Sequence, residues 1–458
     1  MNIVVLNGSP KGLTSVTVQY VRFLQKKLPE HTFAIHNIAS DLRHLEDRPE
    51  AFQSLIAAIA AGDGVLWAFP LYVLLVHAHY KRFIELIEER GAQGAFRGKH
   101  AAALTTSIRF FDHTAHNYIH AVSEDWQMHY WGGFSAEMYD LLKPEERRRL
   151  LRFAEDFLAA ITARTIPPRC HAPIQNRRRE YVSGVPPVRL DAHSKQVLIV
   201  TDAADHQANL QRMIERFRAN FAVPPEVINL HAVNIRGGCL GCIQCGLDNA
   251  CVYRDADDVY AVYRRLMTAD VLVFAGAIRD RYLSSRWKLF FDRGFFNNHV
   301  PMFVGKQLGY LISGPLAQIP NLRQILEAYT ELQQANLAGI VSDECLDGAE
   351  FDRVLDGLAH RLVACAQTGY IAPPTFLGVA GRKLFRDEIW ASLRFVFHAD
   401  HRYYKRHGLY DFPKRSLKTR LTNAVVQLLV RIPRFRKEFL KRIKSEMVKP
   451  LEKLLDKE

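Results

Sequence analysis

Short apolar runs alternate with amphipathic helical patterns along most of the chain. Residues 2–6 form a β-branched apolar run that ends at Gly8-Ser9-Pro10, and residues 14–28 then have helical spacing. The same reading predicts further strands at 33–38, 64–69 and 100–105, and further helices at 50–61 and 79–89. Strands that alternate with helices predict an α/β fold with a parallel sheet covered on both faces.

This order repeats in the second half of the chain. Strands are predicted at 195–200, 271–274 and 307–312, and helices at 258–267 and 285–292. Three pairs of landmarks are separated by the same offset of 207 residues: Asp63 with Asp270, Lys81 with Lys288, and Gly98-Lys99 with Gly305-Lys306. The first strands of the two copies, in contrast, match at an offset of about 194. We infer a tandem duplication in which the second copy gained about 13 residues before its third strand. The predicted fold class is therefore α/β, with two doubly wound parallel sheets in tandem and a basic, mostly helical tail.

Composition divides the chain into four parts. Residues 1–165 and 195–370 form the two predicted domains, the Pro- and Arg-rich residues 166–194 have the composition of a linker, and 371–458 form an extension. A hydrophobic content of 48% excludes disorder as the dominant state. No apolar run reaches the roughly 20 residues of a membrane span, and the start resembles no secretion signal, so we expect a cytoplasmic protein.

The net charge of +13 comes almost entirely from the extension. From residue 371 onward there are 21 Lys and Arg against 9 Asp and Glu. Apolar Phe435, Phe439, Ile443 and Met447 recur there at helical spacing among basic residues. Such a helix is typical of peripheral contact with an anionic membrane face, but it could equally pack on its own body. Without a recognised motif, specific nucleic-acid binding is not expected.

The loop from Asn7 to Thr17 has the composition of a phosphate site. Glycines, hydroxyls and a lysine lie between a parallel strand and a helix, where backbone N–H groups and the helix dipole favour an anion. The loop lacks both GxxxxGK[ST] and GxGxxG, so a single monophosphate is the better prediction. The loops at 70–73 and 105–112 offer an apolar and aromatic ledge beside hydroxyls, which suits a flat ring.

The first half resembles the flavodoxin-like superfamily in three features: the loop LNGSPKG with its following serine and threonine, the FPLY turn and the KRFIE helix. The branch is that of NADPH-dependent FMN reductases and NAD(P)H:quinone oxidoreductases, and the resemblance covers about residues 1–160. It implies FMN as cofactor, NAD(P)H as co-substrate and flavin oxidoreductase activity. It places the phosphate at Ser9, Lys11, Ser15 and Thr17, the ring against Pro70, Leu71 and Tyr72, and the polar edge of the ring at Thr106 and Ser107.

The second copy departs from this pattern. Its first loop carries Asp202 and Asp205 where a phosphate would need Ser and Lys, so we expect it to be degenerate for flavin.

Four cysteines gather within the insertion of the second copy. The spacing of Cys239, Cys242, Cys245 and Cys251 favours a [4Fe–4S] cluster, and leaves zinc or a set of uncomplexed thiols open. The surrounding sequence over residues 195–315 resembles the iron-sulfur flavoproteins, which implies a cluster within a flavodoxin-like domain. The scattered Cys170, Cys345 and Cys365 are predicted to be small buried side chains.

The leading hypothesis is an NAD(P)H oxidoreductase that passes electrons through FMN, and through an iron-sulfur cluster, to a small-molecule or protein acceptor. Tyr72 and His113 are the predicted catalytic residues, because both would shape the acceptor pocket. His113, His116 and His120 would share one face of a helix. These histidines could line a substrate pocket, ligate a metal or lie on a solvent-exposed face. The second copy could close the flavin site within one chain, or two chains could form a homodimer. The alternative function is a non-catalytic redox sensor or scaffold docked on a membrane or complex.

Overall fold

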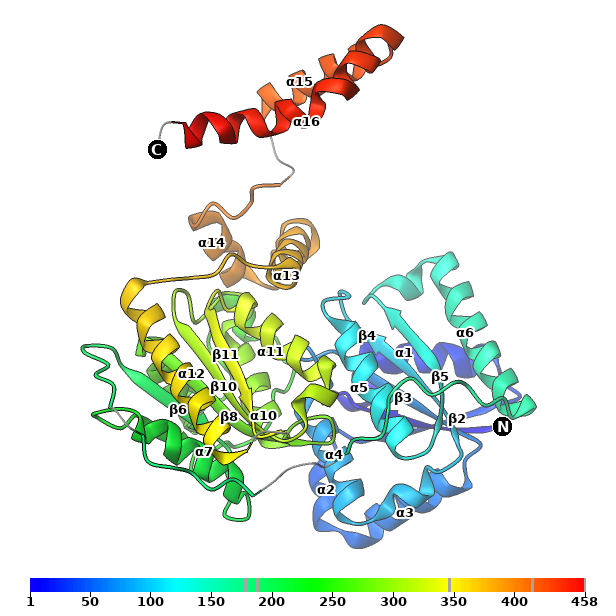
Figure 1. Cartoon of the computed structure of the whole chain (residues 1–458). Coiled ribbons are helices and arrows are strands. Elements are labelled where there is room, and N and C mark those ends of the chain that lie inside the picture. Colours follow the sequence, from blue (N-terminus) through cyan, green and yellow to red (C-terminus); the bar gives the residue numbers. More distant parts are fainter. Residues whose placement is uncertain (176–179, 187–188, 345–346, 413–415, 457–458) are drawn as a thin grey trace. The chain divides into compact units, whose positions relative to one another are not determined.

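The computed structural model describes residues 1–175, 180–186, 189–344, 347–412 and 416–456. Cys345 lies outside these residues. The chain forms two compact units, Met1–His401 and Arg402–Glu458. The first unit contains two parallel sheets, one from each half of the duplicated sequence (Figure 1). The predicted α/β fold class is thereby confirmed.

The first sheet has the strand order β2-β1-β3-β4-β5, which is the flavodoxin-like order. Alternate residues of β1 face opposite sides: Ile3 and Val5 pack with α1 and α6, while Val4 and Leu6 pack with α3 and α4. The elements are β1 Asn2–Asn7, α1 Val16–Lys27, β2 Thr32–Asn37, α2 Leu42–Asp47, α3 Pro49–Ala61, β3 Gly64–Pro70, α4 Ala78–Glu89, β4 His100–Thr106, α5 Asp112–Asp125, β5 His129–Ala136 and α6 Pro144–Ala163.

The second sheet repeats this order as β7-β6-β8-β10-β11, and a short strand, β9, pairs antiparallel with β8. Helices α7 and α12 cover one face, and α9, α10 and α11 cover the other. The elements are β6 Val197–Thr201, α7 Ala208–Ala219, β7 Glu226–Asn229, α8 Cys245–Asp248, α9 Val259–Thr268, β8 Val271–Arg279, β9 Tyr282–Leu283, α10 Ser285–Gly294, β10 Gln307–Ser313, α11 Pro320–Leu332, β11 Asn336–Ser342 and α12 Gly348–Thr368.

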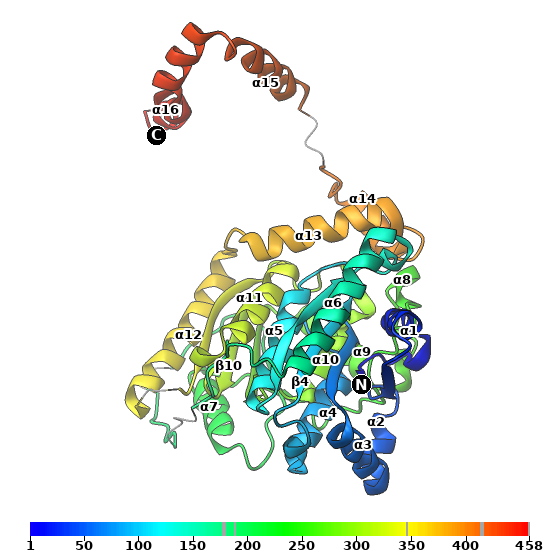
Figure 2. The same cartoon turned by 90° about the vertical axis from the view of Figure 1, so that its right-hand side faces the viewer.

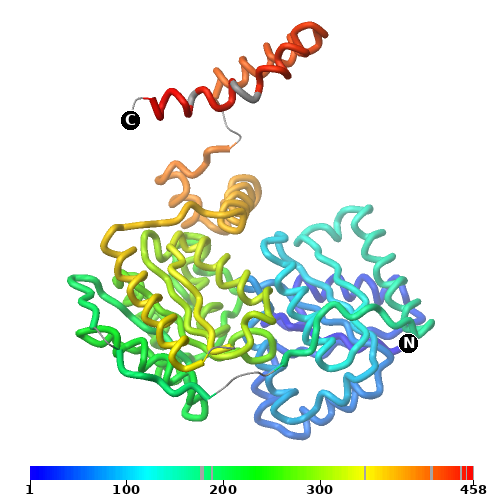
Figure 3. Tube along the Cα trace, viewed as in Figure 1, coloured from blue at the N-terminus to red at the C-terminus, as the bar shows by residue number. Residues whose placement is uncertain are grey.

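The two halves share one continuous hydrophobic core, in which α4 and α5 of the first pack against α10 and α11 of the second (Figures 2 and 3). Their contacts are reciprocal. The Glu85 carboxylate accepts a hydrogen bond from the Ser285 amide at the start of α10, and the Asp292 carboxylate accepts one from the Ala78 amide at the start of α4. Both pairs are related by the offset of 207, so the duplicated halves pack as the two members of a pseudo-symmetric dimer.

Two buried lysines cross the same boundary. Lys81 binds Glu85 and Asp280, with Nζ–O distances of 2.9 and 3.0 Å. Its counterpart, Lys288, binds Asp292 and donates to the carbonyl of Tyr72 at 2.9 Å. Each half therefore supplies a charged group that fixes the loop after the third strand of the other half.

The helices after the second sheet are divided between the two units. Helix α13 (Phe376–Glu388) belongs to the first unit, and α15 (Leu417–Leu429) and α16 (Pro433–Leu455) belong to the second. The π-helical stretch η7 (Ile389–Leu393) and α14 (His398–Arg406) lie between them in sequence. Helix α16 confirms the predicted amphipathic helix. Among the described residues, no helix is both long and apolar enough to cross a bilayer.

Candidate functional site

Three loops meet at the carboxyl edge of the first sheet. The hydroxyl of Thr17, in the first turn of α1, lies 2.6 Å from the hydroxyl of Thr106 at the end of β4. The amide of Leu71, just after β3, donates to the Thr106 carbonyl at 3.3 Å. These bonds bring together residues that sequence analysis predicted on three separate loops. The predicted site residues of the first domain thus share one edge of one sheet.

The first of these loops folds into a compact turn before α1. Ser15 caps the helix, since its hydroxyl accepts the Thr17 amide at 3.2 Å, and Ser9 accepts the Lys11 amide at 3.2 Å. Ser9, Ser15 and Thr17 are buried, whereas Lys11 is exposed. The start of a helix, lined by hydroxyls and with one exposed cation, has the donors that an anion requires.

The backbone of the neighbouring loops is strained. Val73 and Leu74, after Tyr72, have φ values of 34° and 64°, and Arg109 and Phe111, after Ser107, have values of 59° and 56°. A left-handed conformation is unfavourable for residues with side chains, above all for β-branched valine. Such strain is commonly found at functional sites, where the surrounding structure holds it in place.

Residues of the second domain cover this edge. The carbonyl of Cys239 accepts a hydrogen bond from Nε2 of His77 at 2.9 Å. A Cβ atom at Gly241 would overlap with the phenol oxygen of Tyr72 and would lie 2.9 Å from Cε of Lys11. Only glycine allows so close an approach. The cysteine loop therefore touches both a predicted phosphate ligand and a predicted ring contact.

The third loop is covered from another direction. The ring of Phe385, on α13, lies 4.2 Å from the ring of Phe110, measured between centroids. Ser107 accepts the Arg109 amide at 2.8 Å within the same loop. His113 is exposed in the first turn of α5. The edge of the first sheet is thus lined by the second domain on one side and by α13 on the other.

The four predicted metal ligands belong to one loop and differ in exposure. Cys245 is buried, Cys239 and Cys251 are partly buried, and Cys242 is exposed. Burial, with a smaller contribution from neighbouring cysteines, raises the pKa of the Cys239 and Cys245 thiols to about 12. All four are described, and no three of their sulfur atoms lie within 4.8 Å of one another. Thiolates around a single zinc ion would be closer, at about 4 Å, because each Zn–S bond is about 2.3 Å long.

Burial also sets the charge state of the groups around Tyr72. It raises the pKa of the Tyr72 phenol well above its ordinary value. It lowers the pKa of His77 well below the ordinary value, and the neighbouring His79 lowers it further. At neutral pH the phenol is therefore protonated and the His77 imidazole is uncharged. Both can serve as hydrogen-bond donors without adding charge to the site.

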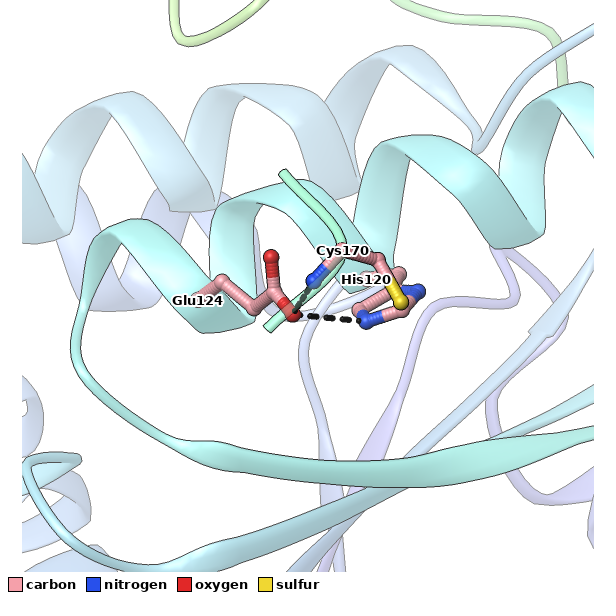
Figure 4. A group of neighbouring side chains, drawn as sticks. All are labelled: His120, Glu124 and Cys170. Carbon is pink, nitrogen blue, oxygen red and sulfur yellow. Dashed lines mark hydrogen bonds and ion pairs between the residues drawn. The ribbon is translucent and has the colours of Figure 1, made fainter. Parts of the chain in front are cut away.

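The three histidines on α5 are not brought together. His116 bonds to the Thr105 hydroxyl at 2.9 Å, and His120 bonds to Glu124 at 3.0 Å. Figure 4 shows one oxygen of Glu124 bonded both to His120 and to the amide of Cys170, and the ligand atoms of these three residues lie within 4.8 Å of one another. The Glu124 carboxylate also accepts the amides of Cys170 and His171. These hydrogen bonds to Glu124 therefore hold the start of the linker against α5.

Cys170 is exposed, so the prediction of a buried side chain was wrong for this residue. A segment that runs along the surface leaves its side chains in contact with solvent, which composition alone does not reveal. Cys365, on α12, is partly buried.

Sequence analysis missed several residues that shape the edge. His77 and His79 contact the cysteine loop, and Lys288 and Asp292 hold the Tyr72 loop from the other domain. For Lys288 and Asp292, the only signal in the sequence was the repetition of Lys81 at Lys288. That repetition indicated duplication and did not indicate a role at the site. No pattern within one half reveals contacts that form between halves.

Comparison with known proteins identifies part of the chain. Residues 1–135 match the sequence profile of the family described as NADPH-dependent FMN reductase. No curated protein matches the chain.

Three solved structures illustrate the similarities. General stress protein 14 of Treponema denticola, solved with FMN, is 15% identical and covers 36% of this chain and 99% of its own, with a TM-score of 0.27. The flavoenzyme NAD(P)H:acceptor oxidoreductase FerB of Paracoccus denitrificans is 21% identical over 36% of this chain and 98% of its own, with a TM-score of 0.28. An FMN-dependent NADH-azoreductase of Bacillus anthracis is 12% identical over 36% and 99%, with a TM-score of 0.27.

These TM-scores are all below 0.5, so the three likenesses establish nothing about function. The profile match covers the strands and loops that build the edge described above, from β1 to most of β5. It ends before the second sheet begins. Over residues 1–135, the first domain therefore belongs to the NADPH-dependent FMN reductase family of oxidoreductases.

Proposed function

We propose that the first domain binds FMN at the edge where its three loops meet, and that the protein is an NAD(P)H-dependent flavin oxidoreductase. The observation that carries the proposal is the joining of three predicted binding loops by the Thr17–Thr106 and Leu71–Thr106 bonds. The family match over residues 1–135 supports it. The donor set also suits the cofactor: buried hydroxyls and a helix start for the phosphate, and an apolar ledge for the ring.

Ser9, Lys11, Ser15 and Thr17 would hold the phosphate, Pro70, Leu71 and Tyr72 would lie against the ring, and Thr106 and Ser107 would contact its polar edge. When bound, FMN supplies hydride acceptance from NAD(P)H. The chain supplies orientation: Lys288 fixes the carbonyl of Tyr72, and the cysteine loop would cover that side of the bound ring. The protonated Tyr72 phenol can donate a hydrogen bond to an acceptor, and His113 would line the mouth of the site.

The cysteine loop would add a one-electron route. Cys239, Cys242, Cys245 and Cys251 would hold a [4Fe–4S] cluster, for which their spacing in the sequence is the support. Because the loop touches Lys11 and Tyr72, these cysteines would hold the cluster on the side of the predicted FMN residues, and a cluster held there would supply one-electron transfer to a small-molecule or protein acceptor.

Titration of apoprotein with FMN tests the first step. Flavin fluorescence should be quenched to saturation at one FMN per chain, and the loaded protein should oxidise NAD(P)H in the presence of a quinone. Absence of quenching would overturn the proposal and leave the non-catalytic alternative. For the cluster, the purified protein should contain iron and acid-labile sulfide, and Cys242→Ser should lose both. If the wild type contains neither after anaerobic reconstitution, the cluster is excluded while the FMN proposal stands.

A second proposal concerns the tail. Helices α15 and α16 leave large apolar side chains exposed, including Leu421, Leu428, Leu440, Met447 and Leu451. Together with the local excess of basic residues, these exposed side chains suit peripheral binding to an anionic bilayer. The protein should sediment with phosphatidylglycerol vesicles and not with phosphatidylcholine vesicles. Leu440→Glu with Met447→Glu should abolish the binding, and unchanged sedimentation of that variant would contradict the proposal.

A further inference from the structure

A second cavity lies at the carboxyl edge of the second sheet. Its volume is about 770 Å³, within the range of small-molecule sites. Its walls include Asp202 after β6, Arg279 at the end of β8 and Arg286 in α10. The first domain contributes Arg43 and Arg82. By the internal duplication, the walls of this cavity after β6 and β8 correspond to the loops after β1 and β3 of the first domain.

The cavity has an excess of positive charge. Its lining residues include Arg43, Arg82, Arg236, Arg279 and Arg286, against the acidic Glu46, Glu85 and Asp202. Some of these charges are already paired: Glu46 binds Arg82 at 2.7 Å, Glu85 binds Lys81 at 2.9 Å, and Glu89 binds both Arg82 and Arg279. Within the described lining, Arg43, Arg236 and Arg286 remain against Asp202. The balance therefore favours an anionic ligand.

Three of the lining arginines, Arg43, Arg236 and Arg286, form no ion pair with a carboxylate in the described part of the chain. Arg286 is held by the carbonyls of Leu230 and Val233, at 2.7 Å from Nη2 in each case. Arg43 donates to the backbone carbonyl of Arg236 at 3.0 Å. The Arg236 guanidinium is exposed and donates to no group in the described part of the chain. A phosphate could take up hydrogen bonds that Arg236 does not use within the protein.

Asp202 gives the cavity a second kind of recognition. Its side chain is only 3% exposed, and Oδ2 accepts the hydroxyl of Ser284. Its Oδ1 has no donor within hydrogen-bond distance among the residues that the structure describes. The Trp287 indole lies near the same carboxylate, and its Nε1 likewise has no partner within hydrogen-bond distance among the described residues. A buried carboxylate oxygen in this state can accept an O–H or N–H group from a ligand.

The anionic group of the ligand must therefore lie in a different place from the phosphate of FMN in the first domain. In the first domain the loop after β1 presents hydroxyls where a phosphate is expected, but Asp202 would repel a phosphate at the equivalent place. The anion must lie on the arginine side instead, with neutral donors toward Asp202. Leu42, Ile235 and Leu289 also line the cavity and offer apolar surface for a flat ring.

From this arrangement we propose that the cavity binds a nucleoside monophosphate, with the phosphate at Arg43, Arg236 and Arg286 and a ribose hydroxyl or base N–H at Asp202. The site is separate from the FMN site, and its existence does not depend on flavin binding. It would make the second copy a nucleotide-binding domain rather than an unused duplicate.

Isothermal titration with AMP tests the proposal, with adenosine and inorganic phosphate as partial probes. AMP should saturate one site per chain, in protein with or without FMN, and each partial probe should bind at least about tenfold more weakly. Arg236→Gln and Asp202→Asn should each weaken AMP binding about tenfold. Arg97→Gln removes an exposed arginine outside the cavity and should have no effect.

Absence of saturable AMP binding would overturn the proposal, as would equal affinity in wild type and Arg236→Gln. Because Arg236 is exposed, its substitution should not impair folding, whereas Asp202→Asn requires a thermal melt as a check. Competition between AMP and FMN at equal stoichiometry would place AMP at the first site and would also reject the proposal. Failure of FMN binding alone would leave it intact.

Discussion

The loops after β1 and β6 occupy the same place in two copies of one fold, yet they have opposite chemistry. The first offers the buried hydroxyls of Ser9, Ser15 and Thr17 at the start of a helix. The second buries the carboxylate of Asp202, and burial raises the pKa of that group to about 6. Meanwhile the contacts between the halves remain reciprocal, with Glu85 and Asp292 each capping a helix of the other half. The comparison shows that a duplicated scaffold can keep its packing while its loops differ in charge and in hydrogen-bonding groups.

The most damaging change should be to give the first loop the charge of the second. Ser15→Asp keeps a good helix cap, because aspartate is favoured at that position, but it places a carboxylate beside the predicted phosphate. FMN affinity should fall at least about 100-fold through charge repulsion. Fluorescence quenching of the apoprotein measures the loss.

Ser15→Thr is the matched control, since it keeps a neutral hydroxyl cap. Its FMN affinity should stay close to that of the wild type. If Ser15→Asp bound FMN as tightly as Ser15→Thr, the phosphate would not lie at this loop.

The next largest effect should be a difference in stability loss between substitutions of the two reciprocal capping residues, Asp292 and Glu85. Asp292→Asn leaves the buried Lys288 without a carboxylate, so we expect a loss of about 3 kcal/mol in stability. Glu85→Gln leaves Lys81 with Asp280, so the loss should be nearer to 1 kcal/mol. Denaturant titration of both variants measures the order, and equal losses would show that the second carboxylate on Lys81 is unimportant.

Gly241→Ala probes the contact of the cysteine loop with the first site. Both Gly241 and Gly91 have φ near +60°, but a Cβ at Gly91 would meet nothing within 4 Å. Each alanine variant should cost about 1 kcal/mol in stability from its left-handed backbone. Only Gly241→Ala should also weaken FMN binding, by about tenfold, because its Cβ displaces Tyr72. Equal FMN affinity in the two variants would separate the cysteine loop from the flavin site.

The smallest effect concerns pH at the boundary between the halves. Burial, together with the neighbouring Asp280, raises the pKa of Glu88 to about 8 from an ordinary value near 4.5. The unfolded chain releases this proton at lower pH than the folded one, so this group's contribution to stability declines as pH rises from about 4.5 to 8. Glu88→Gln should reduce the decline of the melting temperature across that range. Glu155→Gln, on the exposed face of α6, is the control, and an identical pH profile in both variants would refute the prediction.

Much of the fold could be read from local pattern. The predicted strand at 64–69 and helix at 79–89 agree with β3 (Gly64–Pro70) and α4 (Ala78–Glu89), because a buried parallel strand is continuously apolar and a half-buried helix is periodic. The pattern did not predict β5 (His129–Ala136), whose two glycines and mixed burial conceal a strand at the sheet edge. It also did not predict α2 (Leu42–Asp47), which is too short to show a period.

The candidate site was predictable only in its first-domain part. The loop residues could be named because their order along the chain follows the order of parallel strands. The contacts of His77 and Lys288 could not, because each joins residues more than 150 positions apart in the chain. Those partners are selected by the packing of α4 against α10, not by any neighbouring residue.

The amino-acid sequence by itself determined the alternation of strands and helices, the duplication and the two different loop chemistries, since each depends on residues close together in the chain. Only the tertiary structure decided that the cysteine loop of one half lies on the ligand edge of the other, and that Asp202 faces a cavity with excess arginine. The physical reason is that the shared hydrophobic core brings the two halves together, and charged side chains acquire their roles only once that core excludes water.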